Sequence, residues 1–310
     1  MLSMREVEKL FRVTPGTRLR LKDHETDWSG DEDLRRLTSD ELRETAKTFI
    51  VRNLAELADA QERLFANDVY SVLVVLQAMD AAGKDGMVKH VMSGLNPQGC
   101  QVFSFKRPSE DDLDHNFLWR YTRALPERGR IGIFNRSYYE ETLIVRVHPD
   151  VLERQRLPAG KRGKDFWQRR YDDINAFEQH LTNNGTLVLK FFLHISKKEQ
   201  RKRFLERLDN PAKHWKFNVA DLHERAYWDD YRAAYEDTIT QTSTEVAPWW
   251  VIPADNKWVS RALVAAILGK GIKGLGLQPP TLSDAQLAML GEARTQLLTE
   301  SSGKSARRRG

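Results

Sequence analysis

A loop of small residues with a single lysine spans residues 78–86, AMDAAGKDG. An apolar run precedes it and a helical pattern follows it, so its backbone N–H groups would lie at a helix start, where the helix dipole favours phosphate. Lys84 adds a positive charge, and a carboxylate such as Asp80 is an oxygen ligand suited to Mg²⁺. The loop therefore predicts a phosphate site formed by Ala82, Gly83, Lys84, Asp85 and Gly86, with a magnesium ligand supplied by Asp80 or Asp85.

The loop departs from the usual phosphate-binding pattern GxxxxGK[ST] at two positions. Ala78 stands in place of the first glycine, and Asp85 replaces the final Ser or Thr. Without that hydroxyl the metal would need another ligand, which Asp80 or Asp85 would supply. The alternative is a surface turn with an exposed lysine. The apolar run before the loop and the two carboxylates favour the phosphate site.

A second polar group follows the apolar run 130–134, in the sequence IGIFNRSYYEE (131–141). Ligands of open α/β sheets collect at the carboxyl ends of the strands, so catalytic side chains are expected there. Asn135 could hold a metal-bound water, Arg136 could bind phosphate with two hydrogen bonds, and Glu140 could bind magnesium or orient an acceptor. The alternative is an ordinary helix start with Arg136 and Glu140 paired on a solvent-exposed face.

Two clusters of basic residues lie farther along the chain. Residues 156–170 hold six basic residues and one acid, and residues 197–216 hold eight basic residues and three acids. Basic helices and loops that close over phosphates exclude water and neutralise charge in phosphoryl transfer. For either cluster alone the alternative is a solvated helix face. As a lid, the second cluster would contribute Arg203, Arg207, Lys213 and Lys216.

These loops need a sheet that brings them together, and the sequence predicts one. Five short apolar runs alternate with helical patterns, which indicates an α/β fold of three layers with a parallel sheet buried on both faces. The apolar runs are residues 71–77, 101–105, 130–134, 186–195 and 249–252. The helical patterns lie at about 40–66, 84–95, 109–124, 137–147, 165–183, 196–209 and 220–241.

The chain is expected to have three parts. They are an N-terminal arm with a short helix at 1–38, the α/β core at 39–273 with its lid at about 197–220, and residues 274–310, a linker, a helix over 283–299 and a disordered basic tail. An apolar stripe runs along the long helix at 40–66 and fits either the core or a subunit interface. It includes Leu42, Phe49, Leu57 and Leu64. The stripe predicts a homo-oligomer, as a dimer or a tetramer.

The composition favours a folded, non-membrane protein with a local anionic ligand. The 310 residues carry a net charge of +5, but four positive charges lie within residues 301–310, which leaves +1 on residues 1–300. A nearly neutral body argues against a nucleic-acid partner. No apolar run approaches the roughly 18 residues of a membrane span, and no signal-peptide pattern is present. With only one cysteine as well, we expect a cytoplasmic protein.

Several longer motifs resemble, in order, those of the polyphosphate kinase 2 family. They are LQAMDAAGKDG, FKRPSEDDLDHNFLWR, IFNRSYYEE, KFFLHISKKEQRKRFLERLDNPAKHWKF and APWWVIPADNKW. The resemblance implies a P-loop kinase core like that of thymidylate kinase, with a helical lid. It also implies phosphoryl transfer between inorganic polyphosphate and nucleotides with Mg²⁺. By this similarity Asp80, Lys84 and Asp85 belong to the phosphate and magnesium site, Arg136 and Glu140 to the transfer site, and Arg203, Arg207, Lys213 and Lys216 to the lid.

The resemblance extends to a subclass. Family members that act mainly on nucleoside diphosphates, or only on monophosphates, typically carry Asp at the position of Asn135 and Asn at that of Glu140. The sequence here is similar to class III members, which phosphorylate both AMP and ADP, and Glu140 is then associated with the monophosphate. Glu141 stands where Asp is common. Nothing carries over to residues 283–310, which lie beyond the family core.

We therefore expect an enzyme that transfers the terminal phosphoryl group of polyphosphate to AMP and ADP, forming ADP and ATP. Asp80, Lys84, Arg136 and Glu140 would carry the reaction by positioning and charge neutralisation, with Mg²⁺ on Asp80 and Glu140. One alternative is a kinase with ATP as donor, which would not respond to polyphosphate chain length. Another is an RNA- or polyanion-binding protein, with a steep salt dependence and no turnover.

Overall fold

The computed structural model describes residues 3–28, 30, 36–278 and 281–306 of the chain. The chain forms two compact units, Met1–Leu277 and Gln278–Gly310. The first unit holds the sheet and all of the predicted site residues. The second contains a single described helix.

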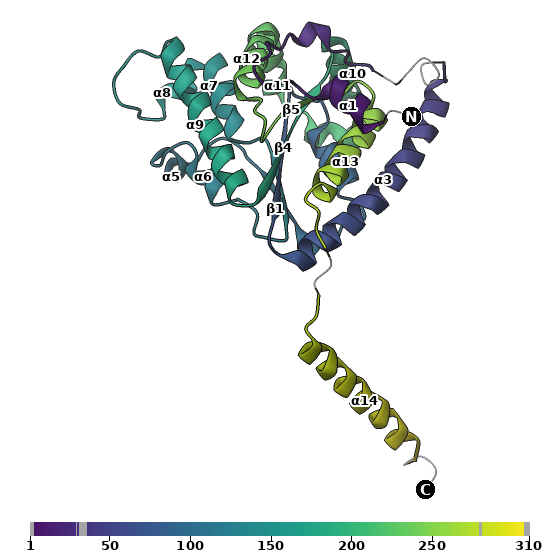
Figure 1. Ribbon diagram of the computed structural model, residues 1–310. Helices are drawn as coiled ribbons and strands as arrows, with labels where there is room; N and C mark the ends of the chain where they lie inside the picture. Colours follow the sequence, from purple (N-terminus) through teal and green to yellow (C-terminus); the bar gives the residue numbers. More distant parts are fainter. Residues whose placement is uncertain (1–2, 29, 31–35, 279–280, 307–310) are drawn as a thin grey trace. The chain divides into compact units, whose positions relative to one another are not determined.

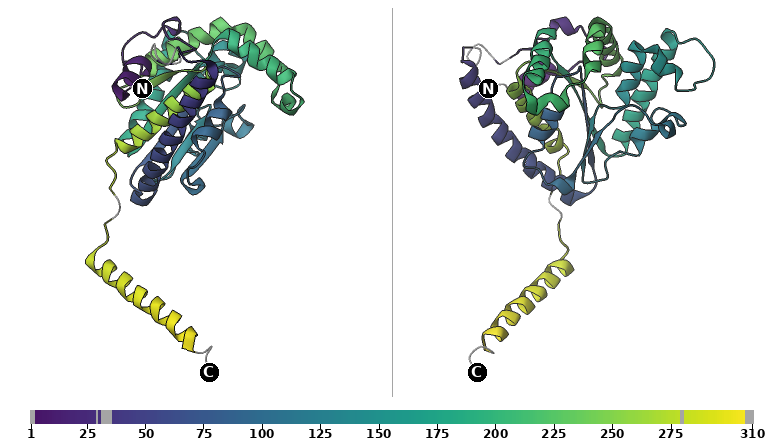
Figure 2. Two further views of the ribbon diagram at one scale, coloured as in Figure 1. Left: turned by 90° about the vertical axis from the view of Figure 1, so that its right-hand side faces the viewer. Right: turned by 180° about the vertical axis from the view of Figure 1, so that it is seen from behind.

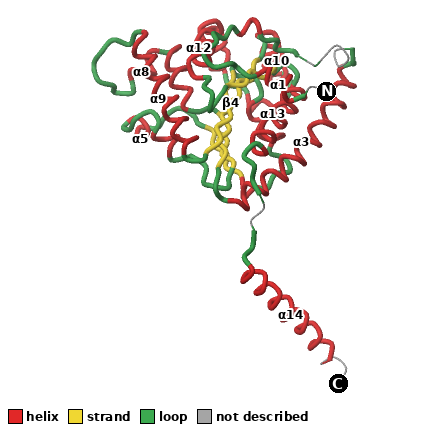
Figure 3. The backbone as a smooth tube through the Cα atoms, viewed as in Figure 1, coloured by secondary structure: helices red, strands yellow, loops and turns green. Residues whose placement is uncertain are grey.

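The first unit is built on a five-stranded parallel sheet (Figure 1; strands in Figure 3). The strands are β1 Ser71–Ala78, β2 Cys100–Ser104, β3 Ile131–Asn135, β4 Thr186–His194 and β5 Trp249–Pro253. Their order is β2-β3-β1-β4-β5, so β1 lies in the middle. Leu76 of β1 lies opposite Asn135 of β3, which brings the loops after these two strands to one edge of the sheet. All five predicted strands are confirmed.

Helices cover both faces of the sheet, as predicted (Figure 2). Val72 and Val74 of β1 join the core on one face, while Leu73 and Val75 join the core on the other, as the two-residue period of a strand requires. The first face is covered by α1 Met4–Phe11, α3 Ser39–Asn67, α4 Lys84–Val91 and α13 Lys257–Lys273. The second is covered by the 3₁₀ helix η3 Tyr138–Thr142, α9 Lys164–Asn183 and α12 Trp228–Thr242.

The long helix α3 begins at a capping box and packs on α13. The Thr38 side chain accepts a hydrogen bond from the Glu41 backbone, and the Glu41 carboxylate accepts one from the Thr38 backbone. Leu57 and Leu64 are fully buried in the core of the first face. These two residues of the predicted stripe therefore serve the core and not a subunit interface, while the side chain of Leu42 lies outside the described residues.

Three predicted helices are interrupted by turns. The helix predicted at 109–124 is two single turns, because the Asn116 side chain accepts a hydrogen bond from the Leu118 backbone and closes a local turn between them. The pattern at 137–147 begins with the 3₁₀ helix η3, and the pattern at 220–241 is broken at Arg225–Tyr227. The remaining helices are η1 Leu21–Asp23, η2 Pro97–Gly99, α5 Glu110–Leu113, α6 Trp119–Thr122, α7 Ile144–Val147, α8 Pro149–Glu153, α10 Lys197–Leu208, η4 Pro211–Lys216, α11 Val219–Glu224 and η5 Arg225–Tyr227.

The second unit contains the helix α14, Asp284–Ala306. Ser283 and Gln286 form a capping box at its start. The helix covers the predicted range 283–299 and continues through part of the segment predicted to be disordered. Residues 307–310 lie outside the described residues, so disorder there stays a prediction. Among the described helices, none combines the length and apolar character needed to cross a membrane.

Candidate active site

The loop between β1 and α4 has the backbone shape of an anion site. Gly83, the N-cap of α4, has φ of +107°, a left-handed conformation that favours glycine. Ala81 also has a positive φ, of +59°. The chain thus turns sharply from the end of β1 into the positive end of α4, as the sequence predicts.

Three consecutive carbonyl groups of this loop are held by α10. Gln200 Nε2 donates to the Asp80 carbonyl at 2.9 Å, and Arg203 donates to the carbonyls of Ala81 and Ala82 at 3.1 and 2.8 Å. In a trans peptide the next N–H points opposite to the carbonyl. By fixing the carbonyls on one side, α10 turns the following N–H groups toward the other side. The Ala82 N–H donates there to the Met79 carbonyl at 3.3 Å, and a phosphate would accept from the Gly83 N–H.

Arg203 is a support of the loop, and its prediction as a lid residue that contacts phosphate is wrong. Its side chain is 4% exposed. Besides the two loop carbonyls, its guanidinium donates to Glu199, Ala254 O and Asp255 O at 2.9, 2.6 and 2.9 Å. An arginine has five N–H donors, and all five are used. Three adjacent basic residues, 201–203, made the inward-facing one impossible to identify from sequence.

Lys84 lies at the start of α4 with its ammonium turned back over the loop. Its Nζ donates to the Ala78 carbonyl at 2.7 Å. Burial, and next the charge of Arg136, lower the pKa of Lys84 to about 8, while Asp80, Glu140 and Asp85 act in the opposite direction. The lysine is therefore charged at neutral pH and closer to its titration point than an exposed lysine.

Asp80 and Arg136 meet at the carboxyl ends of β1 and β3. Arg136 NH2 lies 3.0 Å from Asp80 Oδ1. Arg136 has φ of +65°, a conformation that costs free energy in a residue with a Cβ. The carboxylates of Glu140 and Asp80 raise the pKa of Arg136 above its ordinary value, so it stays charged. The sequence correctly predicted that these residues lie together.

Asn135 lies between β2, β3 and α4. Its Nδ2 donates to Asp85 Oδ1 at 2.8 Å and to Ser104 Oγ at 3.3 Å. Its Oδ1 is buried and has no hydrogen-bond partner among the described residues. Asn135 therefore fixes Asp85, while its own Oδ1 is buried and does not reach the cavity described below.

Glu140 faces the same site from η3. With the Gln77 amide oriented so that its oxygen accepts from Ser137, its nitrogen donates to Glu140 Oε1 at 3.0 Å. Ser137 caps Tyr139, as the alternative of an ordinary helix start predicts. The predicted pair does not form: Arg136 pairs with Asp80 instead, and Arg136 and Glu140 line the same cavity.

The cavity has a volume of about 490 Å³ and contains Asp80, Arg136 and Glu140 in its wall. Sequence reasoning missed the wall formed by α11 and α12. Its lining residues are Asp221, Glu224, Trp228, Tyr231 and Tyr235. They are spaced three or four residues apart, as on one face of a helix, and this periodicity is the sequence signal that could have identified them. The cations around the cavity that were also missed are Lys106, Arg107, Arg120, Arg154 and Arg225.

Comparison with known proteins gives this arrangement a family. A family model described as polyphosphate kinase 2 matches residues 40–276. The chain belongs to the polyphosphate kinase 2 family. The sequence motifs predicted this family, and the parallel sheet with its loop at the start of α4 is the P-loop kinase-like fold that the resemblance implied.

Relatives of the polyphosphate kinase 2 family match nearly the whole first unit. The chain is 53% identical over 259 residues to an ADP-polyphosphate phosphotransferase of Rhodopseudomonas palustris, covering 83% of this chain and 90% of that protein. It is 45% identical over 273 residues to an AMP/ADP-polyphosphate phosphotransferase of Meiothermus ruber, covering 88% and 95%. The crystal structure of polyphosphate kinase 2 from Arthrobacter aurescens TC1 matches with a TM-score of 0.81 at 38% identity, covering 92% and 96%.

The other predicted lid residues of this family member lie apart from Asp80, Arg136 and Glu140 in the cavity wall. Arg207 donates to the Lys216 carbonyl at 3.2 Å and lies 3.5 Å from Asp221, which lines the cavity. Lys213 and Lys216 are exposed on η4, and they are not among the described residues that line the cavity. The structure therefore connects Arg207 to the site and does not bring the two lysines to it.

The predicted metal ligands fit magnesium by their chemistry. Among the described residues, no group of three or more His, Cys, Asp or Glu side chains could hold a metal ion. Asp80 and Glu140 do line one cavity. Mg²⁺ commonly takes one or two protein carboxylates and fills its other positions with water and substrate phosphates. This donor set therefore fits magnesium bound together with a substrate.

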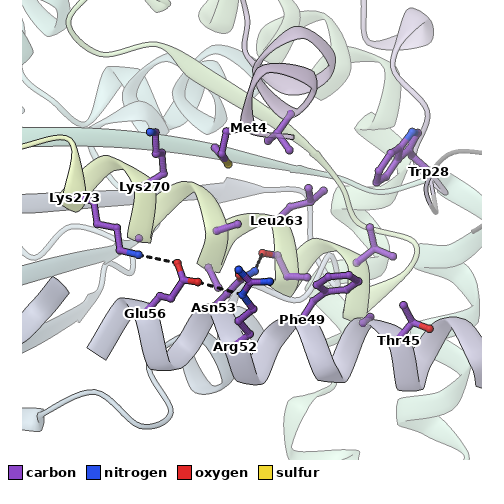
Figure 4. A pocket seen from close by; sticks show the side chains of 17 residues that line it. Met4, Trp28, Thr45, Phe49, Arg52, Asn53, Glu56, Leu263, Lys270 and Lys273 are labelled. Carbon is purple, nitrogen blue, oxygen red and sulfur yellow. Dashed lines mark hydrogen bonds and ion pairs between the residues drawn. The ribbon is translucent and has the colours of Figure 1, made fainter. Parts of the chain in front are cut away.

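A second cavity lies between α1, α3 and α13, away from these groups (Figure 4). It has a volume of about 460 Å³ and a mainly apolar lining that includes Phe49 and Leu263. At its rim Lys273 donates to Glu56 at 2.7 Å. The predicted site residues all lie in the described part of the chain, and none of them lines this cavity. Its lining offers no arrangement for phosphoryl transfer.

Proposed function

We propose that the protein is a polyphosphate:nucleotide phosphotransferase that transfers a terminal phosphoryl group from polyphosphate to AMP and to ADP. One observation carries the proposal. The end of β1 and the start of the loop, Ala78 to Asp80, line the same cavity as Arg136 and Glu140, and α10 fixes the carbonyls of the loop directly beside them. Family membership favours polyphosphate over ATP as the donor.

The donor end of the site would be the loop at the start of α4. Backbone N–H groups, the helix dipole and Lys84 would bind the terminal phosphates, and Arg136 would neutralise charge on the group in transfer. Its pairing with Asp80 holds the guanidinium ready at 3.0 Å. Transfer requires the acceptor oxygen in line with the bond that breaks, so positioning contributes most of the catalysis.

The acceptor would be a nucleoside monophosphate or diphosphate. The Meiothermus ruber relative is named for AMP and ADP, whereas the Rhodopseudomonas palustris relative is named for ADP. Asn135 and Glu140 resemble the class that uses both, and this favours AMP as well as ADP. Glu140 lies within the cavity, where it could orient the monophosphate.

Magnesium would be held by Asp80 and Glu140, with Asp85 nearby through its bond to Asn135 at 2.8 Å. When bound, the ion would neutralise phosphate charge and orient the oxygens of the donor and acceptor. The protein groups would keep the carboxylates in place and exclude water. A homo-oligomeric state and a cytoplasmic location stay predictions.

The experiment incubates the purified protein with AMP, Mg²⁺ and polyphosphate, without ATP, and measures nucleotides by chromatography over time. Formation of ADP followed by ATP is the expected result. ADP alone would contradict the use of both acceptors. No product from AMP, and none from ADP, would overturn the proposal and return attention to an ATP-dependent kinase. Lys84→Ala serves as the control for a contaminating activity.

A further inference from the structure

A buried ion pair lies directly behind the segment that carries Arg136 and Glu140. Lys190 of β4 and Glu178 of α9 are both 0% exposed, and their Nζ and Oε2 atoms are 2.6 Å apart. Lys190 Nζ also donates to the Thr242 carbonyl at 2.6 Å and to the Tyr139 hydroxyl at 2.9 Å. All three N–H donors of the ammonium are therefore used.

Two neighbouring tyrosines of η3 form hydrogen bonds with the same carboxylate. The hydroxyls of Tyr138 and Tyr139 donate to Glu178 Oε1 at 2.8 and 2.7 Å. Burial, and next the charge of Glu178, raise the pKa of both tyrosines far above the ordinary value. Both hydroxyls therefore keep their protons and remain donors throughout the neutral range.

The helix α9 also holds the residue on the other side of Glu140. Arg170, like Glu178 a residue of α9, donates to Glu141 Oε2 at 2.8 Å, and both side chains of this pair are nearly buried. The residues immediately before and after Glu140 are thus tied to one helix. Glu140 itself faces the cavity.

Stability alone does not account for such a network. Burying an ion pair costs desolvation energy, and an apolar pair of similar volume is often equally stable. A strained backbone, such as that of Arg136 with φ of +65°, persists only where its surroundings determine the conformation. The hydrogen bonds of Tyr138 and Tyr139, two and three residues after Arg136, supply that constraint.

We propose that Glu178 and Lys190 are positioning residues that fix Glu140 and Arg136 against the cavity and thereby influence the choice of acceptor. Neither side chain reaches the substrate; they act through Tyr138 and Tyr139. The inference rests on the proposed function, in which Glu140 serves the monophosphate. Removing these hydrogen bonds should therefore lower kcat with AMP more than kcat with ADP.

The test compares Tyr139→Phe with Tyr171→Phe. Tyr139→Phe removes one hydroxyl from the network and keeps the ring. Tyr171 is a buried tyrosine of α9 whose hydroxyl accepts from Arg146 at 2.7 Å and does not bond to Glu178 or Lys190. We expect Tyr139→Phe to lower kcat with AMP about tenfold and kcat with ADP less than threefold, with an unchanged KM for polyphosphate. Tyr171→Phe should leave the AMP-to-ADP ratio unchanged.

If the ratio of kcat with AMP to kcat with ADP is unchanged in Tyr139→Phe, the inference is overturned. Hydrogen bonds with a purely structural role would lower the melting temperature in both variants and leave the choice of acceptor unaltered. If the wild-type protein does not use AMP, the proposed function is at fault instead. A crystal structure of Tyr139→Phe then decides the inference independently: a displaced Glu140 carboxylate supports it, and an unmoved one contradicts it. If Tyr139→Phe does not fold, Tyr138→Phe, which leaves Lys190 fully paired, undergoes the same measurements.

Discussion

Two parts of the cavity wall differ in how the chain holds them. The loop before α4 and the segment Asn135–Glu141 are held by hydrogen bonds from buried side chains of α10 and α9. The exposed segment, residues 209–227, is held less deeply: η4 and α11, which are described throughout, contain no buried residue, and the hydrogen bonds of Glu224 with His148 and Tyr231 are only part-buried. Trp215 within it is 79% exposed.

This difference separates groups that must be fixed from groups that must move. Preorganised charges stabilise a transition state only if they need no rearrangement during the reaction. A lid must open for substrate and close over it, so it is built from parts with few buried contacts. The same wall thus combines a fixed floor, formed by the loop before α4 and the segment Asn135–Glu141, with an exposed cover, residues 209–227, that supplies Asp221 and Glu224 to the cavity.

The largest expected effect comes from removing a charge of the fixed floor. Lys84→Ala should lower kcat about 100- to 1,000-fold, as for other preorganised groups in phosphoryl and acyl transfer. The protein should still fold, because Lys84 lies at the start of α4 and outside the two apolar cores of the sheet. Steady-state rates with ADP and polyphosphate measure the effect, and Lys89→Ala, an exposed lysine of the same helix, is the control. A near-normal kcat in Lys84→Ala would show that Lys84 is not part of the active site.

Breaking the support of the floor should affect both stability and rate. Arg203→Met leaves four carbonyl groups without their donors, among them those of Ala81 and Ala254. We expect a loss of about 3 kcal/mol in the free energy of unfolding and a fall in kcat of about tenfold or more as the loop loosens. Urea unfolding and steady-state assays measure these, with the exposed Lys202→Met as control. A raised KM for polyphosphate with unchanged stability would restore Arg203 to the lid.

The charge state of Lys84 should determine how kcat/KM for ADP depends on pH. Because the pKa of Lys84 is lowered to about 8, the lysine is charged below that pH and neutral above it. We expect kcat/KM for ADP to be level below about pH 8 and to fall about tenfold per unit above it. Rates between pH 6 and 10, with unfolding checked at each pH, provide the measurement. A level profile up to pH 9.5 would contradict it.

The smallest effect should come from the exposed segment. Lys213→Ala combined with Lys216→Ala should raise the KM for long polyphosphate about threefold and leave kcat and stability unchanged, because exposed charges mainly influence association. The effect should diminish at high salt. Lys270→Ala, a lysine at the second cavity, is the comparison. A fall in kcat as large as that of Lys84→Ala would mean that the segment is part of the floor.

The sequence predicted the sheet because each strand is an apolar run bounded by turns, a pattern that burial on both faces requires. It predicted Asp80, Lys84, Arg136 and Glu140 for a related reason. They follow directly after strands, so the sheet itself brings them to one edge.

The sequence could not predict which side chains face inward from the charged helices. α10 carries adjacent basic residues at 201–203, and only the completed packing makes Arg203 the buried one. Asp221 and Glu224 resemble any solvent-exposed pair until the exposed segment is folded over the cavity. The η3 turn likewise depends on Glu178, which is nearly 40 residues away along the chain.

The hydrogen bonds from Arg203 to the carbonyls of the loop 78–86 also have a consequence for synthesis of the chain. The loop leaves the ribosome at residues 78–86, but Arg203 and its anchoring carbonyls at Ala254 and Asp255 follow up to about 170 residues later. At about 5–20 residues per second this is a delay of roughly 10–30 s. During this interval the nascent chain carries the loop 78–86 without the hydrogen bonds from Arg203, and we expect the site to become competent only after β5 has joined the sheet.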